Sequence, residues 1–79
     1  MKTRVAIKLN NEAYNKGEII FIICENDFTK DENIVSIKKE ALFVKESDDK
    51  YWSFPISNVL FWNAITISEE ELENARKNS

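Results

Sequence analysis

Residues 19–24, Ile-Ile-Phe-Ile-Ile-Cys, are the longest apolar run of the chain and decide its fold class. Four isoleucines in six residues are typical of a β-strand, and the lack of alternation predicts a strand covered on both faces. Glu18 and Glu25 flank the run and protect it against aggregation. A strand buried on both faces in a chain of 79 residues favours a curled sheet or a barrel over a flat sheet.

Other segments of the chain have the composition of short strands. Residues 3–9 alternate apolar and polar side chains, which predicts a half-buried strand. Further strands are expected over residues 34–37, 41–45, 51–54 and 59–67. In the last of these, Val59, Phe61, Ile65 and Ile67 fall on one face, and Leu60, Trp62 and Ala64 fall on the other.

The segments between these strands carry turn residues. Gly17, the only glycine, is expected to adopt a positive φ, and residues 13–14 could form a short helical turn before it. Residues 38–40 are a polar break, and residues 47–50 form a hairpin turn. Pro55 ends the ladder of its strand because it has no N–H, and residues 57–58 form a turn or a single 3₁₀ turn.

The C-terminal segment predicts a helix over about residues 69–77. Ser68 and Glu71 fit a capping box, while Ile67 and Leu72 fit a hydrophobic staple. Acidic residues fill the first turn and basic residues the last, as the helix dipole favours. Leu72 and Ala75 are the only apolar anchors of this helix, so we expect it to dock weakly.

Together these elements predict one domain, residues 1–79, with its strands within about residues 3–67. The expected fold is mainly β with a short C-terminal helix. Five to six strands of this length favour a small antiparallel barrel of SH3-like size, or a strongly bent sheet. That likeness concerns shape and implies no function.

The composition argues against an enzyme. The chain has no histidine, one cysteine and one glycine, so a nucleophile–base pair would need Lys or carboxylate chemistry, which no pattern in the sequence organises, and a glycine-built phosphate cradle is not expected. Cys24 ends an apolar strand beside Glu25 and is expected to be a buried, unreactive thiol. We therefore expect no catalytic residues and no cofactor.

The acidic residues do not predict a metal site. Glu25, Asp27, Asp31 and Glu32 lack the alternating spacing and the glycine of a calcium loop, so a solvated acidic loop is expected. The glutamates at the start of the helix fan around its axis and do not converge.

Location is inferred from composition alone. No apolar run approaches the length of a membrane span, and a single cysteine suits a reducing compartment, so we expect a cytoplasmic protein without membrane contact. Nine Asn, nine Lys and ten Ile beside two Arg indicate an AT-rich genome, such as that of a low-GC bacterium or its phage.

The aromatic residues are the feature with most functional potential. Six of them fall between positions 43 and 62 and are divided between two faces of the last strands, which a single-layer core cannot bury together. The hydrophobic core can bury the aromatic residues of one face. The C-terminal helix or a partner must then cover the aromatic residues of the other face. Tyr51, Trp52 and Trp62 are the predicted partner-binding residues, because exposed Tyr and Trp are frequent hot spots of protein interfaces.

These observations favour a small non-enzymatic protein-interaction module of mildly acidic net charge, −3. A phage or prophage origin would make it a modulator or inhibitor of a host protein. The alternative is a nucleic-acid-binding barrel that uses Lys38, Lys39, Lys45 and Lys50 with the aromatic rings. Nucleic acid is the less favoured partner, because acidic residues offset these lysines in sequence. A homo-oligomer is compatible with either function.

Overall fold

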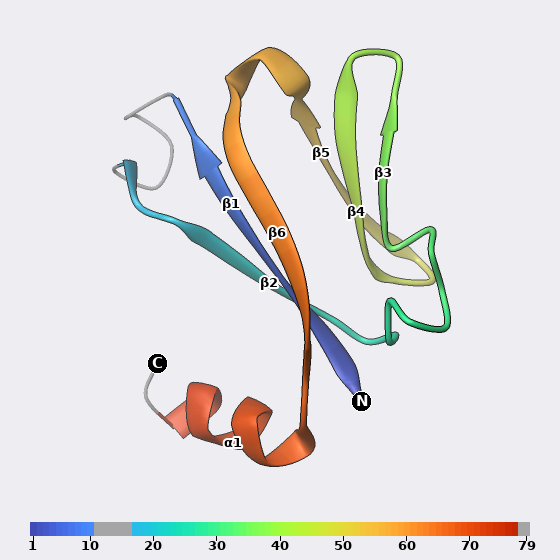
Figure 1. Ribbon diagram of the computed structural model, residues 1–79, viewed down its shortest axis with the longest axis vertical. Coiled ribbons are helices and arrows are strands. Elements are labelled where there is room, and N and C mark those ends of the chain that lie inside the picture. The colour runs from blue at the N-terminus through green and yellow to red at the C-terminus, as the bar shows by residue number, and fades with distance from the viewer. Residues whose placement is uncertain (11–16, 78–79) are drawn as a thin grey trace.

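The computed structural model of the protein describes residues 1–10 and 17–77, except for the side chains of residues 72 and 75–77. The order of elements is six strands, a 3₁₀ turn before the sixth strand, and a C-terminal helix (Figure 1). The elements are β1 (Lys2–Leu9), β2 (Ile20–Cys24), β3 (Val35–Lys38), β4 (Ala41–Ser47), β5 (Lys50–Pro55), η2 (Ile56–Asn58), β6 (Val59–Ile67) and α1 (Glu69–Lys77). The prediction of a mainly β chain with a short C-terminal helix is confirmed.

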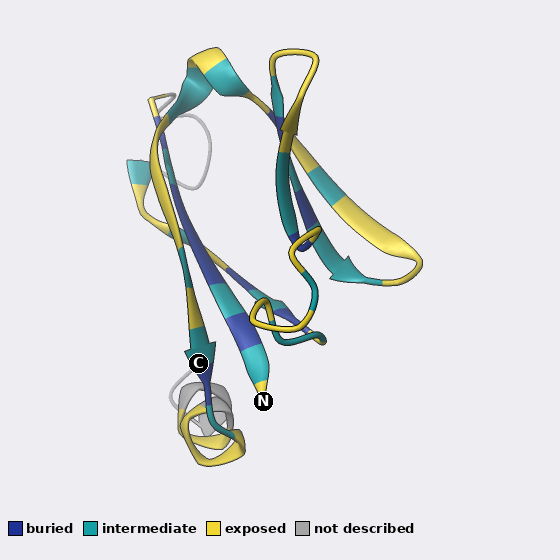
Figure 2. Cartoon of the chain, turned by 45° about the vertical axis from the view of Figure 1, so that its right-hand side comes forward, coloured by how far each residue is buried: buried dark blue, intermediate teal, exposed yellow. Residues whose placement is uncertain are grey.

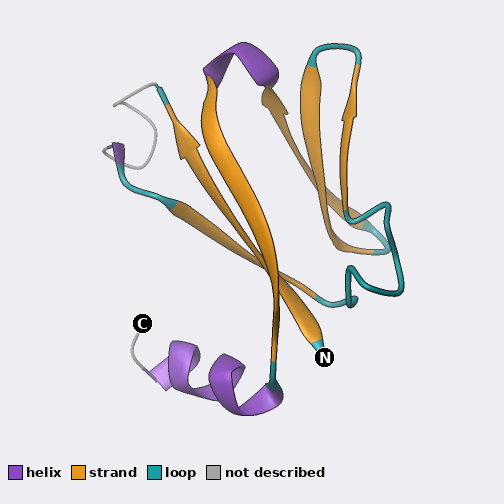
Figure 3. Cartoon of the chain, in the orientation of Figure 1, coloured by secondary structure: helices purple, strands orange, loops and turns teal. Residues whose placement is uncertain are grey.

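The strands form two separate three-stranded antiparallel sheets, and not one closed barrel (Figure 3). The first sheet has the order β2-β1-β6, and the second has the order β3-β4-β5. Two hairpin connections, β3–β4 and β4–β5, keep the second sheet local in sequence, whereas the first sheet joins β1 and β2 to the distant strand β6. Near one corner the sheets are linked by a hydrogen bond from the Glu25 N–H to the Glu46 carbonyl, 2.9 Å long.

The core lies between the two sheets, and side chains from both contribute to it. Alternate residues of β1 point inward, which buries Val5, Ile7 and Leu9 as the sequence pattern predicted. The other members are Ile22 and Cys24 from β2, Ile34, and Leu42, Val44 and Phe54 from the second sheet. Colouring by burial shows the buried residues of β1 between the more exposed strands β2 and β6 (Figure 2).

The strand at the apolar run, β2, is covered on one face only, so the prediction of cover on both faces is wrong. Ile22 and Cys24 are buried, but Phe21 on the opposite face is exposed. The second sheet packs against the inner face of the first, and no further sheet among the described residues covers the opposite face. The continuous apolar run thus produces a sheet with one apolar face open to solvent.

The turns follow the local sequence closely. Gly17 has φ 74°, as predicted. The polar break becomes a tight turn between β3 and β4 in which Lys39 and Glu40 also have positive φ, 49° and 63°. The predicted helical turn at residues 13–14 lies outside the described residues.

Helix α1 begins as the capping motif predicts. The backbone N–H of Glu71 donates to Ser68 Oγ at 3.1 Å, and three glutamates occupy the first turn. The helix follows the end of β6 and lies beyond the strands in Figure 1. The predicted anchors Leu72 and Ala75 have side chains outside the described part.

Candidate interaction surface

The three aromatic residues predicted to bind a partner do not form one surface. Tyr51 and Trp52 are neighbours on β5, so their side chains point to opposite faces of the second sheet. Tyr51 points outward and is 59% exposed, opposite Lys45 on β4. Trp62 belongs to the other sheet, where it pairs with the buried Ile7.

Trp52 is part of the packing at the edge of the core. Its ring stacks on Phe54 with centroids 6.2 Å apart, and its Nε1–H donates to Glu46 Oε1 at 3.0 Å. The ammonium of Lys50 lies over the same ring and also pairs with Glu46 at 3.0 Å. The hydrogen bond from Trp52, followed by that from Lys50, lowers the pKa of Glu46. A ring held by these groups has a structural role.

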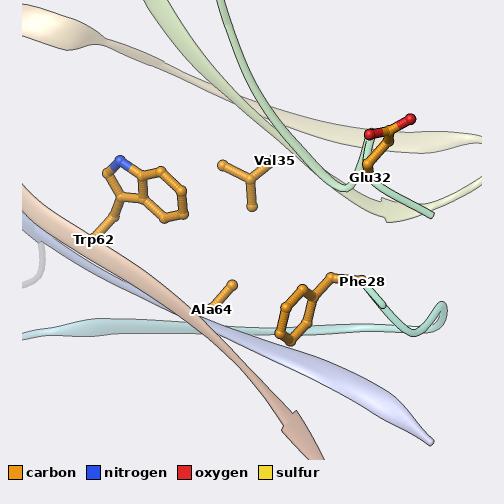
Figure 4. A pocket seen from close by; sticks show the side chains of 5 residues that line it. All are labelled: Phe28, Glu32, Val35, Trp62 and Ala64. Carbon is orange, nitrogen blue, oxygen red and sulfur yellow. The ribbon is translucent and has the colours of Figure 1, made fainter. Parts of the chain in front are cut away.

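Trp62 lines an apolar pocket between the two sheets. Figure 4 shows its indole on one side, with Ala64 further along β6, Val35 on β3, and Phe28 and Glu32 from the loop between β2 and β3. The pocket volume is about 340 Å³, at the lower end of the range for small-ligand sites. Glu32 is its one charged lining residue, so the pocket is suited to an apolar group.

The loop that carries Phe28 is fastened to β1 by one buried hydroxyl. Thr3 Oγ1 donates to the Asn26 carbonyl and accepts from the Phe28 N–H, both at 2.8 Å. Thr3 is fully buried, and these bonds satisfy its hydroxyl. The position of the Phe28 ring at the pocket therefore depends on Thr3.

Several exposed apolar side chains share the outer face of the first sheet. Residues paired across antiparallel strands share a face, so the register assigns its members. This outer face consists of Lys2, Arg4, Ala6 and Lys8 on β1, Phe21 and Ile23 on β2, and Phe61, Asn63, Ile65 and the buried Ile67 on β6. Phe21, Phe61 and Ile65 are 57%, 47% and 37% exposed. Sequence reasoning missed Phe21, because an uninterrupted apolar run does not distinguish a covered face from an open one.

The outer face is apolar and positively charged. The guanidinium of Arg4 lies 5.1 Å from the centroid of the Phe21 ring, an arrangement that fixes both side chains by cation–π attraction. The face includes Lys2, Arg4 and Lys8 and no carboxylate. Among the described residues no ion pair involves Arg4 or Lys8. Arg4 Nε is buried without a hydrogen-bond partner, and the half-buried side chains of Lys2 and Lys8 give the face further positive charge that can meet acidic groups of another molecule.

The four lysines considered for nucleic-acid binding are divided between the two ends of β4. Lys38 and Lys39 are exposed at the β3–β4 turn. Lys45, near the other end, pairs with Asp31 at 3.2 Å and with Asp48 at 3.3 Å, and the bond with Asp31 is the largest cause that raises its pKa. With Lys50 paired to Glu46, two of the four charges are occupied by carboxylates.

The acidic loop residues stabilise local turns. Asp27 Oδ1 accepts from the N–H and the hydroxyl of Thr29, and both bonds lower the pKa of Asp27. Asp31 accepts from the Asn33 N–H and from Lys45, which lowers its pKa in the same way. In the described ranges no group of three or more Asp, Glu, Cys or His side chains could hold a metal ion.

Cys24 has no access to solvent. Burial raises the pKa of its thiol to about 11, and the charge of Glu46 contributes in the same direction. The contributing charge thus comes from the second sheet.

No helix in the described part of the chain is long and apolar enough to cross a membrane. Comparison with known protein families, with curated protein sequences and with solved structures found no match to this chain.

Proposed function

We propose that this protein is a non-enzymatic, cytoplasmic interaction module whose outer face binds an acidic, apolar segment of another protein. The observation that carries the proposal is the exposure of Phe21, Phe61 and Ile65 on one sheet face that contains basic residues and no acidic ones. Large apolar side chains that share a face and remain exposed mark interaction sites. Aromatic and arginine residues are the side chains most enriched at interface hot spots.

The titratable residues support a binding role over catalysis. The chain has no histidine, and the thiol of Cys24 is buried with a raised pKa. Asp27, Asp31 and Glu46 accept hydrogen bonds from neighbouring groups, and these bonds lower their pKa values. A carboxylate with a lowered pKa is a weak general base at neutral pH.

The AT-rich composition extends the proposal to a phage-encoded or prophage-encoded modulator of a host protein. The test is affinity capture with the tagged chain from a low-GC bacterial lysate treated with nuclease. Phe21→Ala and Phe61→Ala should each remove the captured protein. Tyr51→Ala is the matched control, since Tyr51 is an equally exposed aromatic residue on the other sheet and should leave capture unchanged.

Two results would overturn the choice of surface. Capture that survives both phenylalanine substitutions would exclude the outer face. Loss of capture with Tyr51→Ala alone would instead favour the outer side of the second sheet. Circular dichroism of each variant separates loss of binding from loss of folding.

Single-stranded nucleic acid is the second candidate, and one observation favours it. Phe21 and Phe61 are exposed on the same sheet face as Arg4 and Lys8, and base stacking on aromatic rings beside cations is the usual binding mode of single strands. With three basic residues on this face, the binding constant would fall with salt with a logarithmic slope of about −2. Binding to an oligonucleotide with that slope, abolished by Phe21→Ala, would favour this candidate over a protein partner.

A further inference from the structure

Strand β6 has a free edge. It pairs with β1 from Val59 to Ile67, with one register shift at Leu60, and in the described residues no other strand pairs with it. Its nine residues span about 30 Å. A free edge of this length offers a row of backbone N–H and C=O groups to any strand that can lie beside it.

The other three sheet edges carry protective features that β6 lacks. Strand β3 has four residues and ends at Lys38, and β5 begins at Lys50 and ends at Pro55. Strand β2 has five residues, flanked in sequence by Glu18 and Glu25. Strand β6, Val-Leu-Phe-Trp-Asn-Ala-Ile-Thr-Ile, contains neither a charge nor a proline. Short length, charge and proline are three of the means by which proteins prevent edge pairing, and β6 uses none of these three. Its one irregularity, at Leu60, lies near one end and leaves residues 61–67 in regular register with β1.

We propose that β6 pairs with β6 of a second copy of this chain, antiparallel and about a two-fold axis at Asn63. Asn63 is the middle residue of the strand, so this register pairs the regular residues 61–65 of one copy with residues 65–61 of the other. Phe61 then lies opposite Ile65 of the second copy on the outer face. The two β2-β1-β6 sheets become one six-stranded sheet.

The inward side of the same register pairs a large residue with a small one. Trp62 of each copy lies opposite Ala64 of the other, because their positions are symmetric about residue 63. Ala64 lines the apolar pocket between the sheets, at the edge where the second copy would lie. A cavity of about 150 Å³ accepts a benzene ring, so the 340 Å³ pocket has room for part of a second indole. Each copy would thus contribute an aromatic ring to the pocket of the other.

A second copy satisfies this edge better than a foreign strand does. Two identical uncharged strands meet without charge repulsion. In this register Trp62 lies opposite the small Ala64 on the inner face, and Phe61 lies opposite the large Ile65 on the outer face. The register also keeps the outer faces of both copies on one side, since paired residues share a face. Dimer formation does not rest on the function proposed above. Its tests measure the mass and the cross-linking of the pure chain without a partner, so failure of the dimer and failure of the proposed function give different results.

The first experiment measures the mass of the full chain by sedimentation equilibrium between 1 and about 200 µM, a range that detects micromolar self-association. We expect a concentration-dependent rise from 9.2 kDa to twice that mass. Asn63→Lys and Asn63→Glu should each weaken self-association several-fold, because each places two like charges opposite one another at the axis. Mixing the two variants should restore the dimer. Ser53→Lys, an exposed position on β5, is the matched control and should dimerise like the parent chain.

A single cysteine, which can form a disulfide with the same cysteine of the second copy, tests the register directly. Residues opposite one another in an antiparallel pair have Cα atoms about 4.5–5.5 Å apart, within disulfide range. Under oxidation Asn63→Cys should form a covalent dimer, and Ile65→Cys should not. The proposal is overturned if the parent chain stays at 9.2 kDa throughout, or if the mixed charge variants associate no better than each alone. Equal cross-linking of both cysteine variants would overturn the register.

Discussion

The hydroxyl of Thr3 and the backbone N–H of Phe28 form a 2.8 Å hydrogen bond that joins the first strand to the loop at the pocket. The same hydroxyl donates to the Asn26 carbonyl, so one side chain satisfies two backbone groups of that loop. The bond depends on two residues that are 25 positions apart in sequence.

Thr3→Val should destabilise the protein by about 2 kcal/mol, because valine keeps the shape but leaves two partly buried backbone groups without partners. Chemical denaturation of the variant measures this loss. Thr66→Val is the control: Thr66 lies opposite Thr3 on β6, and no hydrogen bond of its side chain is found within the described residues. We expect the control to change stability by less than about 0.5 kcal/mol. Equal effects at both positions would contradict the role of the Thr3 bonds.

The β3–β4 turn should be improved by glycine. Glu40 has φ 63°, a region that costs a residue with a Cβ about 1–2 kcal/mol. Glu40→Gly should therefore be more stable than Glu40→Ala by about 1 kcal/mol, measured as the difference in free energy of unfolding. Because both variants remove the same charge, electrostatic effects cancel in the comparison. A more stable alanine variant would show that the strained backbone is not the controlling factor.

Glu46 should stabilise the protein at neutral pH and lose this effect in acid. Its pKa is lowered in the folded state by the hydrogen bonds from Trp52 and Lys50. The unfolded chain takes up the proton at a higher pH than the folded protein, so this stabilisation is present above the ordinary pKa of 4.5 and disappears as pH falls through the lowered value. Unfolding of the parent chain and of Glu46→Gln should differ at pH 7 and converge near pH 2. A constant difference across this range would contradict the assignment.

Cys24 should make the protein less stable at high pH. The unfolded thiol ionises near pH 9.0, whereas the folded thiol keeps its proton to about pH 11. The unfolded state then binds fewer protons, so the free energy of unfolding falls as pH rises between these values, by up to about 1.4 kcal/mol per pH unit. Cys24→Ala should lack this component. A thiol reagent should also react slowly with the native protein at pH 8 and quickly in denaturant, and fast native labelling would contradict the buried position.

The sequence was most informative where a local pattern determines the structure. The alternation of residues 3–9, the positive φ of Gly17 and the Ser68 cap depend on near neighbours, and each was predictable. The predicted faces of β6 are correct from Phe61 onward, since Phe61 and Trp62 lie on opposite sides of the first sheet. The prediction that Val59 shares the face of Phe61 is wrong: a register shift at Leu60 turns Val59 toward the core.

Long-range packing could not be predicted in the same way. Whether Phe21 is covered depends on whether a second layer reaches that face, and the residues of β2 contain no information on this. The ion pair between Asp31 and Lys45 joins a loop to a strand that is adjacent only in space. The pocket beside Trp62 is closed in part by Phe28, whose loop is bound to Thr3. The hydrophobic pattern of the sequence gives no information on such a contact.

The pairing of β1 with β6 also determines when the protein can fold during synthesis. β1 is the middle strand of its sheet, yet its partner β6 occupies residues 59–67. A ribosome makes the chain from β1 onward, so the β1–β2 hairpin emerges with one edge unpaired and its inner face uncovered. The sheet can close only after residue 67 leaves the exit tunnel, and contacts this distant in sequence form slowly. Nascent chains that stop before β6 should therefore remain protease-sensitive, and those that extend past α1 should become resistant.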